Sequence, residues 1–212
     1  MKQKLIVFSA VALGAMLTVA NVSVTRAADI IDEWASVKAP PPPELKPVTV
    51  DAKTTALLVM DFLPGGYCAK QPRCVAALPS VKKILDAARA ANATVIYSIA
   101  GNFTMADTLK EVAPLGNEPY VKAHADKFLD TDLDKILKDK GIQTVITTGT
   151  SGNGAVLYTA SEAAIRGYKV IVPVDGLPST DPYAEQLTVW QLAHGPGFAK
   201  QVTITRSDMI KF

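Results

Sequence analysis

The sequence predicts an α/β protein with a Rossmann-like, doubly wound parallel sheet, a three-layer α/β/α sandwich. Apolar runs alternate with longer stretches of helical periodicity from residue 55 to residue 205, as in chains that build a parallel sheet between helices. The apolar runs are nearly continuous, which is typical of strands buried on both faces. Residues 142–176 read as strand, tight turn, helix and strand in succession, which is one parallel βαβ unit.

The first half of the domain begins with a predicted strand, residues 55–61, that ends in the carboxylate of Asp61. A helix is expected over residues 75–92, because apolar side chains recur there on one helical face. The remaining elements of this half are strands at 93–99 and 120–122 and a short helix at 105–112.

The second half repeats the alternation of helix and strand. Residues 131–140 form a predicted helix that Gly141 ends. The βαβ unit follows, with strands at 142–148 and 169–175 around a helix at 155–166. A helix at 181–194 and a strand at 201–205 complete the expected elements.

Residues 1–27 have the features of a secretory signal peptide. Lys2 and Lys4 precede an apolar run over residues 5–20, and small residues lead to Ala27. Cleavage is expected after Ala27, with Ala20 as the alternative site. An uncleaved membrane anchor is the competing interpretation, but the run is shorter than the ~20 apolar residues that a spanning helix needs. The protein is therefore expected to be periplasmic or secreted.

Residues 28–47 form an N-terminal segment that ends in a proline-rich linker. A short helix is expected over residues 29–38, and Pro40–Pro43 together with Pro47 favour a stiff, extended chain. This linker could be a spacer, or an arm that lies across a partner subunit. The globular domain then occupies residues 48–212.

The charge balance gives no indication of a basic, nucleic-acid-binding protein. The chain has 22 basic and 20 acidic residues, and three of the basic ones, Lys2, Lys4 and Arg26, precede the expected cleavage point. The 19 basic residues that remain give a net charge near −1. No Lys/Arg cluster with interleaved aromatic residues is present, so we do not expect nucleic acid as a partner.

Two cysteines, Cys68 and Cys74, lie six positions apart in a polar loop. In an oxidising compartment two such residues tend to pair, and this small ring would contribute about 2 kcal/mol. Two free thiols or a pair of metal ligands are the alternatives. A metal site would need further ligands, and the only histidines are His124 and His194.

Three places could contribute to chemistry. Asp61 lies at the carboxyl edge of the sheet, where ligands bind, and burial would suit it to acid–base work, although it could simply cap a turn. Lys122 follows an apolar pair and could form an ion pair with a carboxylate at that edge or be solvated. The Gly-rich turn before Ala155 could offer backbone N–H groups to an oxyanion, or could be a structural turn without a ligand.

Taken together, these places resemble the isochorismatase-like (cysteine hydrolase) superfamily. Three segments carry the resemblance: residues 57–61, Val121-Lys122 followed by Phe128 and residues 131–133, and residues 148–160. The resemblance as a whole extends over about residues 54–205. Many members are oligomeric and hydrolyse amides with an Asp/Lys/Cys triad. The resemblance implies that Asp61 is the acid–base residue and Lys122 the lysine.

The resemblance also implies a backbone site at the turn, with a cis peptide between Thr150 and Ser151 and an oxyanion hole of N–H groups that includes Gly154. Residues expected near a substrate from their positions are Tyr67, Phe103, His124, Asn153 and Tyr158.

The chain departs from the family's pattern where the nucleophile should stand. Ala155 occupies the cysteine position, and residues 98–103 lack the histidines of the nicotinamidase metal site, so we expect no catalytic metal and no cofactor. Leu63 replaces the Gln or Asn that often follows the first Asp. Isochorismatases proper also work without the cysteine, because Asp protonates a vinyl ether and water adds to the resulting cation.

Three hypotheses follow. The chain is a hydrolase of a small carbonyl, amide or enol-ether substrate that uses Asp61 and Lys122 without a thiol. Alternatively it is an inactive binding protein that keeps the pocket for a small ligand. The third hypothesis is that Ala155 replaces, by engineering, the cysteine of a cysteine hydrolase.

Overall fold

The structure, a computed structural model, describes residues 26–212, so the greater part of the expected leader lies outside the described residues. The chain divides at Pro40 into two units. In the first, α1 (Ile30–Glu33) begins at Asp29, whose side chain accepts hydrogen bonds from the backbone of Ile31 and Asp32. This helix is shorter than the expected 29–38. Across residues 26–212, no helix has the length and apolar character required to cross a membrane.

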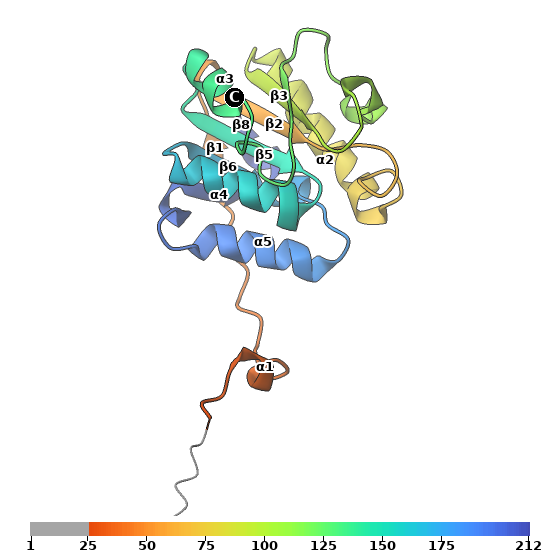
Figure 1. The fold of residues 1–212 in the computed structure, drawn as a ribbon. Coiled ribbons are helices and arrows are strands. Elements are labelled where there is room, and N and C mark those ends of the chain that lie inside the picture. Colours follow the sequence, from red (N-terminus) through yellow and green to blue (C-terminus); the bar gives the residue numbers. More distant parts are fainter. Residues whose placement is uncertain (1–25) are drawn as a thin grey trace, which may run out of the picture. The chain divides into compact units, whose positions relative to one another are not determined.

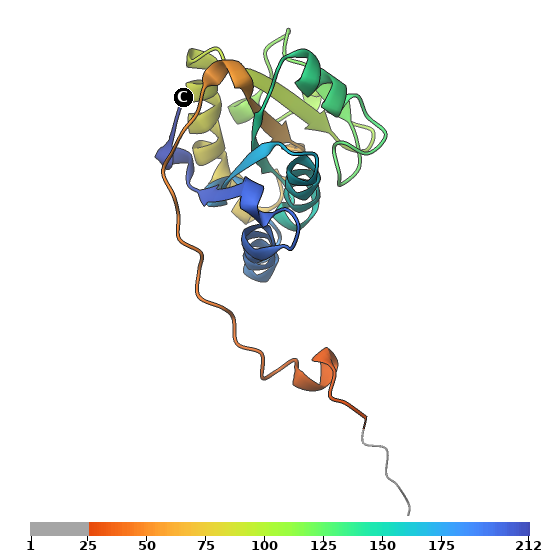
Figure 2. The same cartoon turned by 90° about the vertical axis from the view of Figure 1, so that its left-hand side faces the viewer.

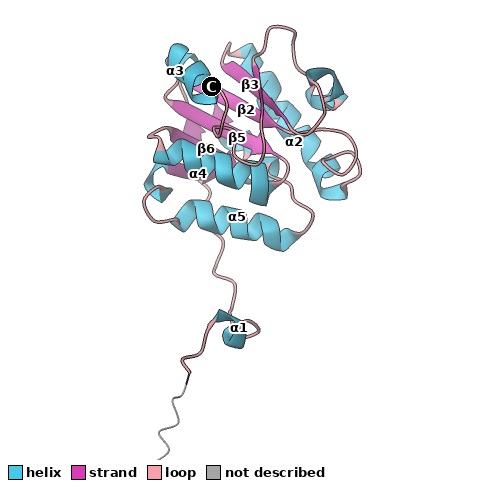
Figure 3. Cartoon of the chain, in the orientation of Figure 1, coloured by secondary structure: helices cyan, strands magenta, loops and turns pink. Residues whose placement is uncertain are grey.

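The second unit is built on a six-stranded parallel sheet with the strand order β4-β3-β2-β5-β6-β7 (Figures 1 and 3). The strands are β2 (Thr55–Met60), β3 (Thr94–Ile99), β4 (Tyr120–Lys122), β5 (Thr144–Gly149), β6 (Lys169–Pro173) and β7 (Val202–Thr205). The chain starts in the middle of the sheet, builds one side and crosses to the other. The predicted doubly wound sheet is confirmed.

Helices cover both faces of this sheet, which gives the three layers (Figure 2). The helices are α2 (Pro72–Ala90), α3 (Leu133–Asp139), α4 (Leu157–Ile165) and α5 (Pro182–His194). Leu57 and Val59 of β2 belong to the same buried cluster as the apolar face of α2. Leu58 and Met60 belong to the opposite cluster, which contains residues of α3, α4 and α5. Alternation along one fully buried strand therefore supplies both cores.

Several boundaries differ from the expected ones. Helix α2 begins at Pro72 rather than at residue 75, since proline fits the first helical turn and Cys74 is already buried. The expected helix at 105–112 is two separate 3₁₀ turns, η2 (Met105–Asp107) and η3 (Lys110–Val112). A parallel pair of two-residue strands, β1 (Val48–Thr49) and β8 (Ile210–Lys211), was not predicted, because so short a pair carries no periodicity.

The ends of the central strands place three segments at one edge of the sheet. Met60, the last residue of β2, is in register with Ser98 of β3 and with Gly149 of β5. A Cβ atom on Gly149 would lie 2.7 Å from the Cβ of Met60, so only glycine permits this approach. Asp61, Ser98 and the turn after Gly149 consequently meet at the carboxyl edge of the sheet.

Candidate functional site

Asp61 follows β2 directly and is held in an uncommon conformation. Its backbone φ is +59°, a left-handed value that non-glycine residues adopt rarely and often at functional sites. Its side chain is buried, with 4% of the residue exposed. Ser98 Oγ donates to Oδ1 at 2.8 Å, and Lys127 Nζ donates to Oδ2 at 2.6 Å. Both carboxylate oxygens therefore have a donor in a site without much solvent.

The lysine beside Asp61 is Lys127, and the expectation of Lys122 for this place is wrong. Lys122 ends the edge strand β4 with an exposed side chain. The strand buries Val121 toward the core, so alternation turns the side chain of Lys122 away from it. Lys127 comes after an irregular stretch and is 1% exposed.

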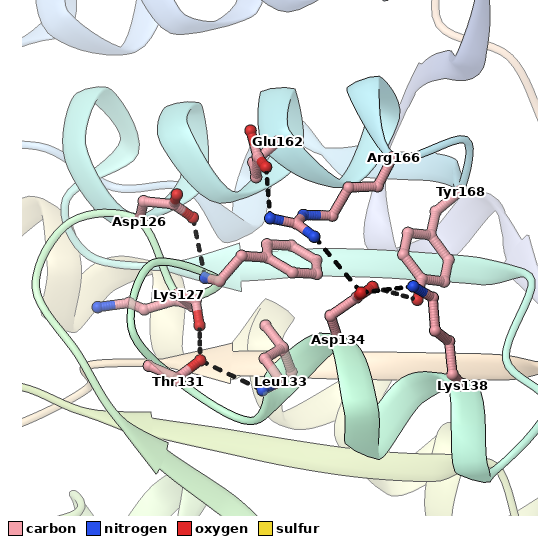
Figure 4. A network of polar contacts seen from close by, with 10 residues as sticks. Asp126, Lys127, Thr131, Leu133, Asp134, Lys138, Glu162, Arg166 and Tyr168 are labelled. Atoms are coloured by element: carbon pink, nitrogen blue, oxygen red, sulfur yellow. Dashed lines mark hydrogen bonds and ion pairs between the residues drawn. The ribbon is translucent and has the colours of Figure 1, made fainter.

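Local contacts fix the loop that carries Lys127 (Figure 4). Asp126 Oδ1 accepts the N–H of Phe128 at 2.9 Å, and the Thr131 hydroxyl donates to the Lys127 carbonyl. The N–H of Lys127 donates to Thr159 Oγ1 of α4 at 3.1 Å. With the backbone held on both sides, the ammonium group reaches Asp61 and the carbonyl of His124.

Burial raises the pKa of Asp61, although the charge of Lys127 and the hydrogen bonds from Lys127 and Ser98 lower it in part. The raised pKa means that the protonated form persists to higher pH than for an ordinary aspartate. A carboxyl group of this kind is suited to donate a proton to a substrate and to take one back.

The turn after β5 contains the expected cis peptide between Thr150 and Ser151. The N–H of Thr150 donates to the Met60 carbonyl at 3.1 Å, and the N–H of Gly154 donates to the Ser151 carbonyl at 3.1 Å. These two N–H groups are therefore engaged, which contradicts their expected place in an oxyanion hole. Within residues 26–212, the Ser151 N–H makes no hydrogen bond to another backbone group.

Ala155 lies in a π-helical turn, η4 (Gly152–Val156), that precedes α4, so the expected α-helix from residue 155 begins two residues later. Ala155 is 4% exposed and belongs to the apolar cluster on the α4 side of the sheet. A Cβ atom on Gly152 would lie 2.4 Å from the Leu177 carbonyl oxygen. Close packing, rather than backbone φ, therefore requires glycine at that position.

The other expected residues lie at different places. The rings of Tyr67 and Phe103 meet edge to face with centroids 5.5 Å apart, whereas the His124 side chain is exposed and Tyr158 is 56% exposed on α4. The N–H of Asn153 lies 3.4 Å from the Ser179 hydroxyl. The sequence did not point to Ser98, Lys127 or Ser179. For Ser98 the available signal was a serine just before the last residue of the strand predicted at 93–99.

Cys68 and Cys74 form a disulfide with a Cα–Cα distance of 5.2 Å, and both residues are fully buried. In the part of the chain that the structure describes, no group of three or more His, Cys, Asp or Glu residues is placed to hold a metal ion.

Comparison with known proteins finds one family and several relatives. Residues 55–206 match the family model described as the isochorismatase domain. A secreted isochorismatase effector, Isc1, of Verticillium dahliae is 30% identical over 149 residues, which is 64% of this chain and 78% of that protein.

Solved structures have the same fold. An isochorismatase-like hydrolase from Alkaliphilus metalliredigens is 25% identical with a TM-score of 0.64, over 73% of this chain and 95% of that one. A cysteine hydrolase from Pseudomonas syringae pv. phaseolicola is 21% identical with a TM-score of 0.67, over 78% of this chain and 94% of that one. The second likeness concerns the fold alone.

Proposed function

Because the chain belongs to the isochorismatase family, we propose that it is a hydrolase whose acid–base group is Asp61 and whose reaction needs no thiol. The observation that carries this proposal is the intact, buried group of Asp61, Lys127 and Ser98 beside a turn without a nucleophile. A pocket that had lost all chemistry would have no need to keep a lysine buried against a carboxyl group, since burying charge is costly.

An enol ether is the substrate class that these residues serve best. Protonated Asp61 gives its proton to the terminal carbon of the double bond, which leaves an oxocarbenium cation and an Asp61 carboxylate. Water adds to the cation and returns a proton to the carboxylate, and the resulting hemiketal separates into an alcohol and a ketone. Lys127 and Ser98 hold the carboxyl group through both transfers. No covalent intermediate with the protein is required.

Amides and other carbonyl compounds demand more of the site. Without a thiol, water would be the nucleophile, Asp61 would act as base, and the Ser151 N–H would receive the developing negative charge. A covalent nucleophile would divide amide hydrolysis into two easier steps through an acyl-enzyme intermediate, and this path is lost without the thiol. A binding protein without activity remains the alternative function, favoured by the methyl group of Ala155 at the nucleophile position.

A comparison of the unaltered protein with Ala155→Cys separates these functions. We expect the unaltered protein to hydrolyse members of an enol-ether panel that includes isochorismate, and to leave a panel of small amides unchanged. Ala155→Cys is expected to gain amide hydrolysis while it keeps the first activity. Absence of turnover by the unaltered protein on every substrate, with amidase activity only in Ala155→Cys, would instead identify a binding protein or a disabled cysteine hydrolase.

Export is the second part of the proposal. The charged and apolar start of the chain supports it, as does the relative whose name describes it as secreted. Export would place Cys68 and Cys74 in a compartment where their disulfide persists. Mass spectrometry of protein isolated from its producing organism should find Ala28 at the N-terminus; an intact Met1 terminus would reject processing.

We further propose that the protein is a homo-oligomer. Tyr183, Leu187 and Trp190 recur at helical spacing on α5 and are 40–61% exposed, which is an apolar stripe of the kind that a second copy covers. Light scattering at micromolar concentration should give at least a dimer mass for the unaltered protein and a monomer mass for Trp190→Glu. A dimer mass for both proteins would place the interface elsewhere, and a monomer mass for the unaltered protein would reject the proposed oligomer.

A further inference from the structure

The disulfide loop contacts the cis-peptide turn through two separate routes. Each route starts at the residue before a cysteine: Tyr67, which precedes Cys68, bonds the turn directly, and Arg73, which precedes Cys74, reaches it through other residues. The disulfide holds the Cα atoms of the two cysteines 5.2 Å apart. The disulfide therefore sets the spacing of the Tyr67 carbonyl and the Arg73 side chain, the two groups from which the routes to the cis-peptide turn begin.

The first route runs through a main-chain carbonyl. The hydroxyl of Thr150, at the cis peptide, donates to the Tyr67 carbonyl at 2.9 Å. The Tyr67 ring packs edge to face on Phe103 in the loop after β3. The start of the turn is therefore attached to a loop that is itself held in place.

The second route runs through a chain of polar groups. Arg73 Nε donates to Glu185 Oε1 at 2.8 Å, and its Nη2 pairs with Oε2. Glu185 Oε1 also accepts the N–H of Ser179 at 2.9 Å. Ser179 is fully buried, and its hydroxyl lies 3.4 Å from both the N–H and Oδ1 of Asn153.

The segment next to Ser179 contacts the turn as well. The N–H of Gly152 donates to the Pro178 carbonyl at 3.0 Å, and the Leu177 carbonyl closes the space where a Gly152 side chain would stand. Displacement of residues 177–179 would therefore move Gly152 and Asn153 with it.

We infer that the Cys68–Cys74 loop is a clamp that positions the turn of residues 150–155, with Arg73, Glu185 and Ser179 as positioning residues. The inference rests on the proposed function in taking this turn as the part of the site that meets the substrate. An exposed ion pair alone would contribute little, and the Arg73 side chain is 44% exposed. Glu185 differs, because it is 19% exposed and also holds the backbone of Ser179.

A thiol introduced at the turn tests this clamp without any need for hydrolysis. The chain has two cysteines, and both lie in the disulfide, so Ala155→Cys carries a single free thiol at a position that is 4% exposed. Its alkylation by iodoacetamide, at a pH where the thiol is ionised, measures how often the turn opens. We expect Arg73→Gln, and separately Cys68→Ser with Cys74→Ser, to accelerate this reaction about tenfold.

The matched control is Arg89→Gln, which breaks a similar two-bond pair with Glu118 at the other end of α2. It should lower stability without changing the alkylation rate. Equal rates in the parent and in both clamp variants, or equal acceleration by the control, would overturn the inference. Hydrogen exchange of residues 151–156 in Arg73→Gln, with Ala155 kept, gives a second measurement: faster exchange supports the clamp and unchanged exchange rejects it.

Discussion

Replacement of Asp61 by asparagine is expected to lower kcat on an enol-ether substrate by about 10²–10⁴-fold, the usual contribution of a positioned acid–base group. Asparagine keeps the size of the side chain and one oxygen for Ser98, but it cannot give or accept the proton. Steady-state rates with urea unfolding of each variant would separate a chemical effect from loss of folded protein. Asp175→Asn is the matched control, because Asp175 lies at the same edge of the sheet and its carboxylate binds Ser207.

The dependence of the rate on pH is a second test of the role of Asp61. Since enol-ether hydrolysis needs protonated Asp61, kcat/KM should fall as pH rises through the pKa of Asp61, which burial raises above the ordinary value of about 3.9. If Asp61 acted as base toward water on an amide, the rate would rise over the same interval. A rate that is independent of pH across this interval would contradict both roles.

The sequence predicted the sheet well because its strands are buried on both faces. An apolar run as short as residues 55–60 is typical of a buried strand rather than of a helix, which is usually longer. Each predicted strand overlaps an observed one. Boundaries were less accurate where local geometry departs from the common helix, as at η4, whose π-helical turn has no distinct residue pattern. The two-residue strands β1 and β8 were not predicted, because strands this short have no recognisable sequence pattern and are defined only by their pairing with each other.

The candidate site was predicted in part, and the errors have a physical origin. Asp61 and the turn of residues 150–155 directly follow the strands β2 and β5, so their positions could be predicted from the positions of those strands in the sheet. Lys127 follows four irregular residues after β4, and its approach to Asp61 depends on capping by Asp126 and on Thr131. Likewise, the engaged N–H groups of Thr150 and Gly154 result from contacts that only the folded turn creates.

Replacement of Lys127 by methionine is expected to lower the free energy of unfolding by about 3–5 kcal/mol at neutral pH. Methionine has a similar length and fits an apolar site, so the loss arises from a carboxylate left buried without its cation. Urea unfolding measures the change. Lys122→Met is the control from the same segment; its side chain is exposed, and the change should stay within about 0.5 kcal/mol.

Two features of this prediction distinguish a buried ion pair from simple loss of packing. First, the pKa of Asp61 is raised in the folded state, so the ionised form of Asp61 destabilises the fold. The stability that protonated Asp61 contributes is fully present below the ordinary aspartate pKa, and it is lost as pH rises through the raised folded-state pKa. The deficit of Lys127→Met should therefore shrink in acid. Second, Asp61→Asn combined with Lys127→Met leaves no unpaired charge and should recover most of the lost stability.

A cost for Lys127→Met no greater than that for Lys122→Met, or no recovery in the double variant, would show that the pair does not hold this part of the fold. The double variant also separates stability from chemistry. It should be nearly as stable as the parent, yet it lacks the group that transfers the proton, so its kcat should be lowered at least as much as that of Asp61→Asn on every substrate that the parent hydrolyses. A stable and active double variant would remove Asp61 and Lys127 from the mechanism altogether.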